Sequence, residues 1–336
     1  MIKTLKYRLK ILLEKIRNLL NASDQLSKLM ILQDRTMSSV KTIINSSNQI
    51  NNLLVLQGRT LALQNVERAP FASIKEAEFK VFSQSGEDGI LQYIIHESGI
   101  EDDEKTFVEF GVEDYSEANT RFLLVNNFWR GLIIDGDKTN MNKVRNSDLY
   151  WKTNLTAIDA WVDKESINQL IGDAGFSGKL GILSIDIDGN DYWVWEQISV
   201  VDPVIVVVEW NSVFGPKHAV TTPYSAEFNR AKAHYSCLYW GASMRAFEIL
   251  GEKKGYQLVG SNALGNNIFF IKKERIGRMV PITTKDAYVE SQFRDSRNKH
   301  GELNFLSGYQ RYREICELPL VDVTSNTLTS LKILDQ

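Results

Sequence analysis

Residues 107–137 read FVEFGVEDYSEANTRFLLVNNFWRGLIIDGD, and this stretch predicts a strand, a tight turn, a helix and a second strand. The run FVEF is short and apolar-rich and ends at Gly111, which is typical of a buried parallel strand followed by a sharp turn. Residues 116–126 have the apolar positions of a crossover helix, and the run GLII forms a second strand that ends at Asp135. The stretch is therefore predicted to be a βαβ unit of a parallel sheet.

The polar residues at the two strand ends predict a cofactor that contains a ribose and a positive charge. Asp135 is placed to accept hydrogen bonds from both ribose hydroxyls, and Glu109 supplies a second acceptor. A pyrophosphate needs a glycine-rich turn, but here Gly111 is followed by Glu113 and Asp114, whose carboxylates repel a diphosphate. S-adenosylmethionine (SAM) has a ribose, a sulfonium and no phosphate, so it fits better. The alternative is an ordinary βαβ unit without a ligand.

The composition is that of an ordinary globular chain. A length of 336 residues suggests about two domains, and a net charge of −3 gives no general electrostatic reason to bind nucleic acid. The two cysteines, Cys237 and Cys316, form neither a disulfide framework nor a zinc pattern and suit a reducing compartment. Because neither a transmembrane run nor the apolar core of a signal peptide is found, we expect a cytoplasmic protein.

Residues 1–69 differ from the rest of the chain and predict a helical arm. They contain no proline, and a mostly apolar heptad seam runs from Leu9 to Leu61, with polar members after Ile44 that predict a break or a second helix. A seam of this length favours a coiled coil over a lone helix, so we expect a homo-oligomer. The first twenty residues carry six basic side chains against a single acid, Glu14. This cluster indicates a membrane-surface helix at the inner face beside an assembly complex, a solvated face of the coiled coil, or both.

The segment after Pro70 leads into a helix whose first turn carries acids. Gln84 and Ser85 precede this helix and are candidate cofactor contacts. Residues 70–275 are expected to form the catalytic domain. The more polar tail, residues 276–336, is expected to be a helical extension that packs on it.

Three further strands are predicted at residues 149–157, 180–187 and 204–208. Thr156 lies at the expected end of the first of these and is a further candidate cofactor contact. Later in the chain, residues 256–272 contain two strands joined around a Gly-Asn pair, which predicts a hairpin. Together with the βαβ unit, this order of elements predicts an open α/β sheet.

Acidic and amide side chains collect at the ends of these strands, where ligands bind in an open parallel α/β sheet. The set is Glu109, Asp135, Asp186, Asp188, Glu209 and Asn211. Such carboxylates repel each other unless cations lie between them, and the sulfonium supplies one cation. Asp186, Asp188, Glu209 and Asn211 are predicted to share Mg²⁺ or Mn²⁺, which would activate a substrate hydroxyl, with Asp188 among the catalytic residues. Alternatively, Asp186 contacts the cofactor, Asp188 caps a helix and Glu209 binds substrate directly.

Residues 212–239 show no periodicity, and a loop of this length inside a compact domain is usually functional. His218 is the candidate general base there, because histidine titrates near neutral pH. Its alternative is an incidental loop histidine. Tyr224 and Tyr239 either stack on a sugar ring or belong to the core.

Together these motifs resemble the class I SAM-dependent methyltransferases of the FkbM-like group. The likeness lies in residues 107–137, in LSIDIDGNDYWVW at 183–195, in VVVEWNS at 206–212 and in the hairpin YQLVGSNALGNNIFFIKK at 256–273, and it covers about residues 80–275. It implies a Rossmann-like α/β fold in which Glu109, Gly111 and Asp135 hold SAM and Asp186 lies near its methionine end. The Glu209-Trp210-Asn211 end is similar to metal-dependent O-methyltransferases.

The resemblance implies O-methylation of sugars or natural products, and we expect a carbohydrate hydroxyl as the acceptor. The basic, coiled-coil arm indicates a surface polysaccharide or its lipid-linked precursor. Two alternatives stay open. One is a coiled-coil scaffold whose α/β domain binds a glycan or a partner without turnover. The other is a nicotinamide-dependent oxidoreductase, which the missing glycines disfavour.

Overall fold

The computed structural model describes residues 30, 32–33, 35–39, 42 and 49–336. The chain divides into two compact units, residues 1–56 and residues 57–336. Apart from Met30, Gln33 and Met37, the heptad seam predicted from Leu9 to Ile44 lies outside the described residues, as does the basic cluster of the first twenty residues. Within the described ranges, no helix is both long and apolar enough to cross a bilayer.

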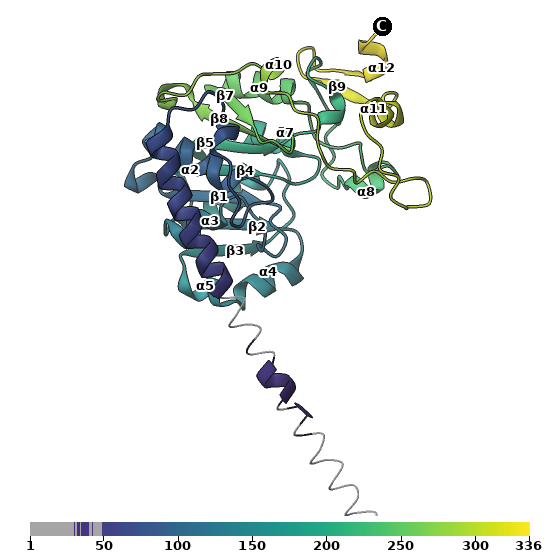
Figure 1. The fold of residues 1–336 in the computed structure, drawn as a ribbon. Coiled ribbons are helices and arrows are strands. Elements are labelled where there is room, and N and C mark those ends of the chain that lie inside the picture. The colour runs from purple at the N-terminus through teal and green to yellow at the C-terminus, as the bar shows by residue number, and fades with distance from the viewer. Residues whose placement is uncertain (1–29, 31, 34, 40–41, 43–48) are drawn as a thin grey trace, which may run out of the picture. The chain divides into compact units, whose positions relative to one another are not determined.

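A mixed seven-stranded sheet forms the centre of the second unit (Figure 1). The strand order is β3-β2-β1-β4-β5-β8-β7, in which the first five strands are parallel and β8 is antiparallel to both of its neighbours. This order is that of the Rossmann-like class I methyltransferase fold, so the predicted fold class is confirmed. The strands are β1 Thr106–Phe110, β2 Arg130–Asp135, β3 Leu155–Asp159, β4 Gly178–Ile185, β5 Val201–Glu209, β7 Tyr256–Ser261 and β8 Asn267–Lys272.

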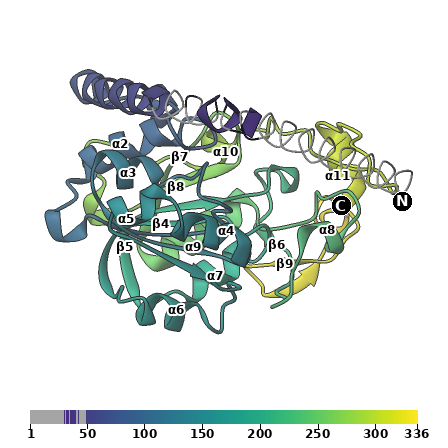
Figure 2. The same ribbon diagram turned by 90° about the horizontal axis from the view of Figure 1, so that it is seen from below.

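Helices cover both faces of this sheet, because alternate side chains of each buried strand point to opposite sides. Figure 2 shows α2 and α3 on one side and α6 and α7 on the other. The helices of the first side are α2 Glu87–Ser98, α3 Arg121–Asn126 and α4 Lys138–Arg145, and those of the second are α6 Ile167–Asp173, α7 Asp191–Gln197 and α9 Met244–Lys254. Residues 57–68 are also helical, and Gly58 packs against Val81 and Phe122.

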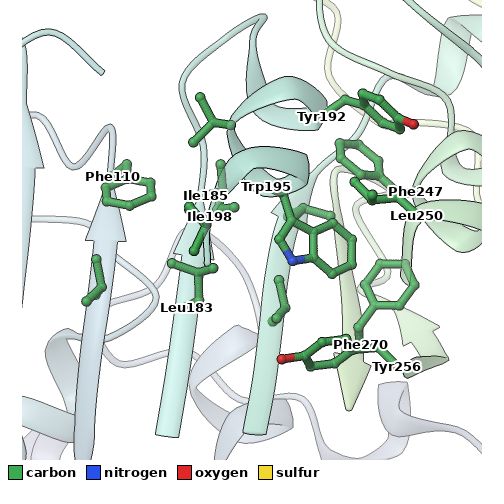
Figure 3. Packing of buried hydrophobic residues seen from close by; sticks show 14 of the residues in the cluster. Phe110, Leu183, Ile185, Tyr192, Trp195, Ile198, Phe247, Leu250, Tyr256 and Phe270 are labelled. Atoms are coloured by element: carbon green, nitrogen blue, oxygen red, sulfur yellow. The ribbon is translucent and has the colours of Figure 1, made fainter. Parts of the chain in front are cut away.

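Trp195 of α7 lies at the centre of the core on the second side (Figure 3). Its ring centroid is 5.0 Å from that of Phe270 and 5.9 Å from that of Tyr256. Phe247 of α9 completes the aromatic contact at 6.1 Å. These contacts hold α7, and with it the loop that follows β4, firmly on the sheet.

A small three-stranded sheet, of order β10-β9-β6, joins the tail to the segment after β5. Residues 276–336 therefore contain strands as well as the predicted helices. The remaining elements are η1 Ile74–Ala77, η2 Asp102–Glu104, α5 Asp148–Lys152, η3 Ser212–Phe214, β6 Val220–Thr221, α8 Arg230–Ala233, η4 Lys273–Arg275, α10 Thr284–Ala287, α11 Tyr309–Ile315, β9 Leu320–Asp322, β10 Thr327–Thr329 and α12 Leu331–Leu334.

Two predicted elements differ from the structure. The helix predicted at residues 116–126 begins only at Arg121. The strand predicted at residues 149–157 is replaced in its first half by α5, where Asp148 and Lys152 form an i,i+4 ion pair of 2.7 Å. The strand itself lies further on, so Thr156 pairs with Leu132 inside the sheet rather than standing at the strand end.

Candidate active site

A cavity of about 1060 Å³ lies at the carboxyl ends of β1, β2, β4 and β5. Seven of the predicted site residues line it, namely Gln84, Glu109, Gly111, Asp135, Asp186, Asp188 and Glu209. The fold thus brings together side chains that are up to 125 positions apart in the chain, from Gln84 to Glu209. The edge is the one at which open α/β sheets bind their ligands.

Gly111 is the point where the ends of β1, β2 and β4 meet. Its backbone N–H donates to the carbonyl of Ile134 at 3.0 Å. Its φ is +70°, and a Cβ at this position would lie 1.5 Å from the backbone oxygen of Asp186. Only glycine fits such a close approach, so this residue is a requirement of the turn.

Asp135 lies at the end of β2 with its carboxylate held by two backbone donors. One oxygen accepts from the N–H of Glu113 and the other from the N–H of Asp137, both at 2.8 Å. A carboxylate offers about four acceptor sites, so each oxygen keeps capacity for a further donor. The side chain is oriented by the turn after β1 and can accept hydrogen bonds from two hydroxyl groups.

Glu109 lines the same cavity, but its carboxylate is already engaged by the protein. It accepts from the backbone N–H groups of Asn119 and Thr120, at 2.9 and 3.1 Å, and from the hydroxyls of Thr120 and Ser184. Burial raises the pKa of Glu109, and these hydrogen bonds oppose the rise. These hydrogen bonds link β1 to β4 and to the start of α3. This also explains why residues 116–120 are not helical.

Asp186 and Glu209 face each other at the ends of β4 and β5 and are hydrogen-bonded through their side chains. Burial, and then the charge of Asp188, raise the pKa of Asp186 to about 8. Burial and the charge of Asp186 raise the pKa of Glu209 as well. Oε2 of Glu209 is buried and has no hydrogen-bond partner among the described residues. Both shifts favour a proton shared by the pair, which is placed to exchange it with a bound group.

The four predicted metal ligands do not come together as a set. The amide of Asn211 donates to the carbonyls of Leu238 and Trp240, both at 2.9 Å, and accepts from the N–H of Val213. Asp188 is bound by Arg230 at 2.9 Å. Within the described part of the chain, no three His, Cys, Asp or Glu side chains are grouped so that they could hold a metal ion. The donor set present does not fit the predicted Mg²⁺ or Mn²⁺.

Three other predicted site residues lie outside the cavity lining. Nε2 of His218 is 2.8 Å from Oδ1 of Asp335, beside the small sheet, so we assign His218 no catalytic role. Thr156 lies inside β3 rather than at its end. The backbone of Ser85 donates to Glu87 at 2.8 Å, at the start of α2, so Gln84 alone of this pair faces the cavity.

The two tyrosines that were candidates for stacking on a sugar ring form hydrogen bonds outside the cavity. Tyr224 donates its hydroxyl to Glu165, and Lys164 lies over its ring. Tyr239 is buried and donates to the carbonyl of Pro319. Of the two alternatives given above, Tyr239 is a core residue, and neither ring lines the cavity.

Trp161 and Arg230 are two of the cavity-lining residues that the sequence analysis missed. Trp161 follows β3 and lies over Gly136, next to Asp135, and its indole donates to the carbonyl of Ala226 at 2.7 Å. It was missed because the third strand was predicted to end too early. Arg230 binds both Asp188 and Asp295. No local signal identifies it, because Asp295 lies 65 positions further along the chain.

No protein-family model matches the sequence, and no protein of curated function matches it. Several solved structures have a similar fold. The N-terminal domain of EvdMO1 with S-adenosylhomocysteine (SAH) bound is 11% identical over 66% of this chain and 97% of that chain, with a TM-score of 0.36. An O-methyltransferase from Bacillus cereus in complex with SAH is 12% identical over 65% and 90%, with a TM-score of 0.35. The DszA carbon methyltransferase is 11% identical over 57% and 53%, with a TM-score of 0.35.

Two of these neighbours are named as methyltransferases of different acceptor chemistry and the EvdMO1 domain has SAH bound, and together they do not single out the FkbM-like group. At such low identities and TM-scores we draw no function from them. The strand order of the sheet and the geometry of its carboxyl edge carry the assignments that follow.

Proposed function

We propose that this chain is a SAM-dependent methyltransferase that methylates a hydroxyl group of a carbohydrate. The observation that supports it most directly is the junction at Gly111, which orients the free acceptor sites of Asp135 toward a large cavity at the carboxyl edge of the sheet. A ribose bound there would donate its two hydroxyls to Asp135. Trp161, beside Asp135, offers an aromatic face for a base.

The charge of the cavity favours a cationic cofactor over a diphosphate. Its lining contains nine carboxylic side chains, Glu109, Glu113, Glu117, Asp135, Asp137, Asp186, Asp188, Glu209 and Asp295, against three basic ones, Lys138, Arg230 and Arg297. A sulfonium is stabilised by this excess, whereas a pyrophosphate is repelled. The nicotinamide-dependent alternative is disfavoured for the same reason.

The Asp186–Glu209 pair supplies the proton acceptor that the reaction needs. Bound SAM would supply an activated methyl group to the acceptor oxygen, and SAH would take the electrons of the broken carbon–sulfur bond. The hydroxyl proton passes to the carboxylate pair. Because burial holds the pair near its titration point, it is suited to general base catalysis close to neutral pH.

The partners of the arm remain proposals that rest on the sequence. The heptad seam supports homo-oligomerisation, and the basic cluster supports contact with the inner face of a membrane or with an assembly complex there. A surface polysaccharide or its precursor is the acceptor consistent with that placement.

The test is turnover. The purified chain is incubated with SAM and a panel of oligosaccharides, and SAH is quantified with and without excess chelator. We expect SAH to accumulate with at least one glycan and to be unaffected by the chelator, because Asn211 and Asp188 are bound by protein groups. SAH binding without any turnover would favour the scaffold alternative. Loss of activity in chelator would overturn the metal-free assignment of Asp186 and Glu209.

A further inference from the structure

Two smaller cavities continue the site away from the cofactor cavity. The first, of about 170 Å³, shares Asp186, Glu209, Arg230 and Asp295 with the cofactor cavity. The second, of about 520 Å³, shares Ser212 and Arg311 with the first and reaches α11. The carboxylate pair thus borders a series of adjoining cavities that leads from the cofactor to the C-terminal extension.

Arg311 lies between these two cavities with most of its hydrogen-bonding capacity unused. It is 6% exposed, and within the described residues its side chain donates one hydrogen bond, from Nη1 to the carbonyl of Ser291 at 3.3 Å. Its Nε is buried without a partner, and its Nη2 lies 3.7 Å from Oδ1 of Asp295, which also lacks a hydrogen-bond partner. The two side chains thus form an ion pair across a gap of 3.7 Å, too long for a direct hydrogen bond, and Nε of Arg311 and Oδ1 of Asp295 are both buried without a hydrogen-bond partner, which is costly in the free protein.

A hydroxyl group satisfies both sides of this gap, because it accepts from a guanidinium and donates to a carboxylate at once. A carboxylate or phosphate on the ligand would satisfy only Arg311. It would also face Glu290 and Asp335, which line the larger of the two cavities, and Asp295, which lines the smaller. The chemistry of this gap therefore matches a neutral polyol better than an anion.

An exposed aromatic face stands at the outer end of the same path. Tyr309 is 71% exposed, and its ring stacks on that of Tyr312 with centroids 5.4 Å apart and planes 16° apart. The hydroxyl of Tyr312 is fixed to Asp335 at 2.6 Å, so the stack is held in place. Both tyrosines line the larger cavity. A flat, rigid aromatic surface beside polar groups is suited to the apolar face of a sugar ring.

We propose that the two cavities form an acceptor subsite for a neutral oligosaccharide, with one sugar ring on Tyr309 and a hydroxyl between Arg311 and Asp295. This inference rests on the proposed function and deepens it by locating the acceptor subsite and by specifying an uncharged glycan. The bound chain leads toward the Asp186–Glu209 pair, which receives the reacting hydroxyl. Acceptor selection then belongs to residues 290–312, which lie outside the methyltransferase-like segment.

The test measures binding of the full chain, saturated with SAH, to an array of neutral, uronate-containing and phosphorylated oligosaccharides. Neutral glycans are expected to be retained, and Tyr309→Ala is expected to weaken their binding about tenfold. The matched control is Trp151→Ala, which removes an aromatic side chain that is 72% exposed and lines none of the three cavities; its binding is expected to stay within about twofold of wild type.

Retention of charged glycans alone, retention of none, or equal binding by wild type and Tyr309→Ala would each overturn the subsite. Calorimetric SAH affinity, measured on the same samples, keeps the two proposals separate. Glycan binding without SAH binding would contradict the proposed function but support the subsite. SAH binding without neutral-glycan binding would overturn the subsite but support the proposed cofactor.

Discussion

At the scale of single residues, Asp135 carries the cofactor assignment. Among the described acids that line the cavity, it is the one whose two oxygens are each oriented by a single backbone donor and keep free acceptor sites. Glu109, which the sequence analysis placed beside it, accepts hydrogen bonds from four protein donors and stabilises the loop before α3 instead. The two carboxylates look alike in the sequence and differ only in their neighbours.

Asp135→Asn is expected to weaken SAH binding by about ten- to hundredfold, because one ribose hydroxyl loses a charged acceptor. Isothermal titration calorimetry provides the measurement. The control is Asp159→Asn at the neighbouring end of β3, where the carboxylate pairs with Arg145 at 2.7 Å and does not line the cavity. Equal losses in both variants would show that Asp135 acts on folding rather than on the ribose.

Glu209 and Asp186 predict the pH dependence of the reaction. The pair accepts a proton only in its deprotonated form, and the raised pKa of Asp186 means that this form grows as the pH rises to about 8. With a hydroxyl acceptor, kcat/KM is expected to increase with pH up to about 8 and then to level off.

Glu209→Gln keeps the size of the side chain but cannot take the proton, so kcat is expected to fall by about 10²- to 10⁴-fold. Glu117→Gln is the control, because this carboxylate also lines the cavity but pairs with Lys80 at 3.1 Å. A Glu209→Gln enzyme that keeps wild-type kcat and the same pH profile would remove the pair from the mechanism.

Residue roles could be predicted from sequence only where the fold itself sets them. Gly111 and Asp135 follow apolar strands directly, so their position at the sheet edge followed from the pattern alone. The contacts of Asn211 and His218 could not be predicted, because the groups that bind them, in residues 238–240 and at Asp335, come from distant segments. No local pattern reveals such partners.

At the scale of elements, the β1–α3 turn depends on the contact between Gly111 and β4. Gly111→Ala is expected to lower the free energy of unfolding by at least about 3 kcal/mol, because a Cβ 1.5 Å from the Asp186 carbonyl forces β1 and β4 apart. Urea unfolding measures the loss.

Gly178→Ala separates the clash from the backbone strain. Gly178 has a similar φ of +68°, but no atom lies within 4 Å of its added Cβ, so only about 1–2 kcal/mol is expected. If both variants lose the same amount, the close approach of β4 to Gly111 contributes nothing.

Strong apolar runs made most of the sheet predictable, and β3 shows where this failed. The segment before it contains Leu149, Tyr150 and Trp151, which suit a strand by composition. The Asp148–Lys152 ion pair and the following turn instead give α5. The predicted end of this strand therefore lies two residues too early. For this reason Thr156 was assigned to the site and Trp161 was not recognised.

At the scale of the whole molecule, all of the described residues that line the cofactor cavity belong to the unit of residues 57–336. Removal of residues 1–56 is therefore expected to leave SAH affinity within about twofold of the full chain. Fluorescence competition with labelled SAH can compare the two proteins. A tenfold or greater loss would mean that the first unit completes the site.

The acceptor side of the site could not be predicted because it comes from the tail. Asp295, Arg297 and Arg311 reach the cavities from a segment that lies beyond the methyltransferase-like part of the chain. The sequence there shows only a mixed polar pattern, and its contribution depends on how the tail packs against β6 and the loop after β5.

The most direct test of the account is a calorimetric titration of SAH into the full-length wild-type chain. The account predicts one saturable site per chain with a dissociation constant in the micromolar range, about −8 kcal/mol at 1 μM. An absence of binding at millimolar SAH, from a sample whose cooperative unfolding shows it to be folded, would contradict it.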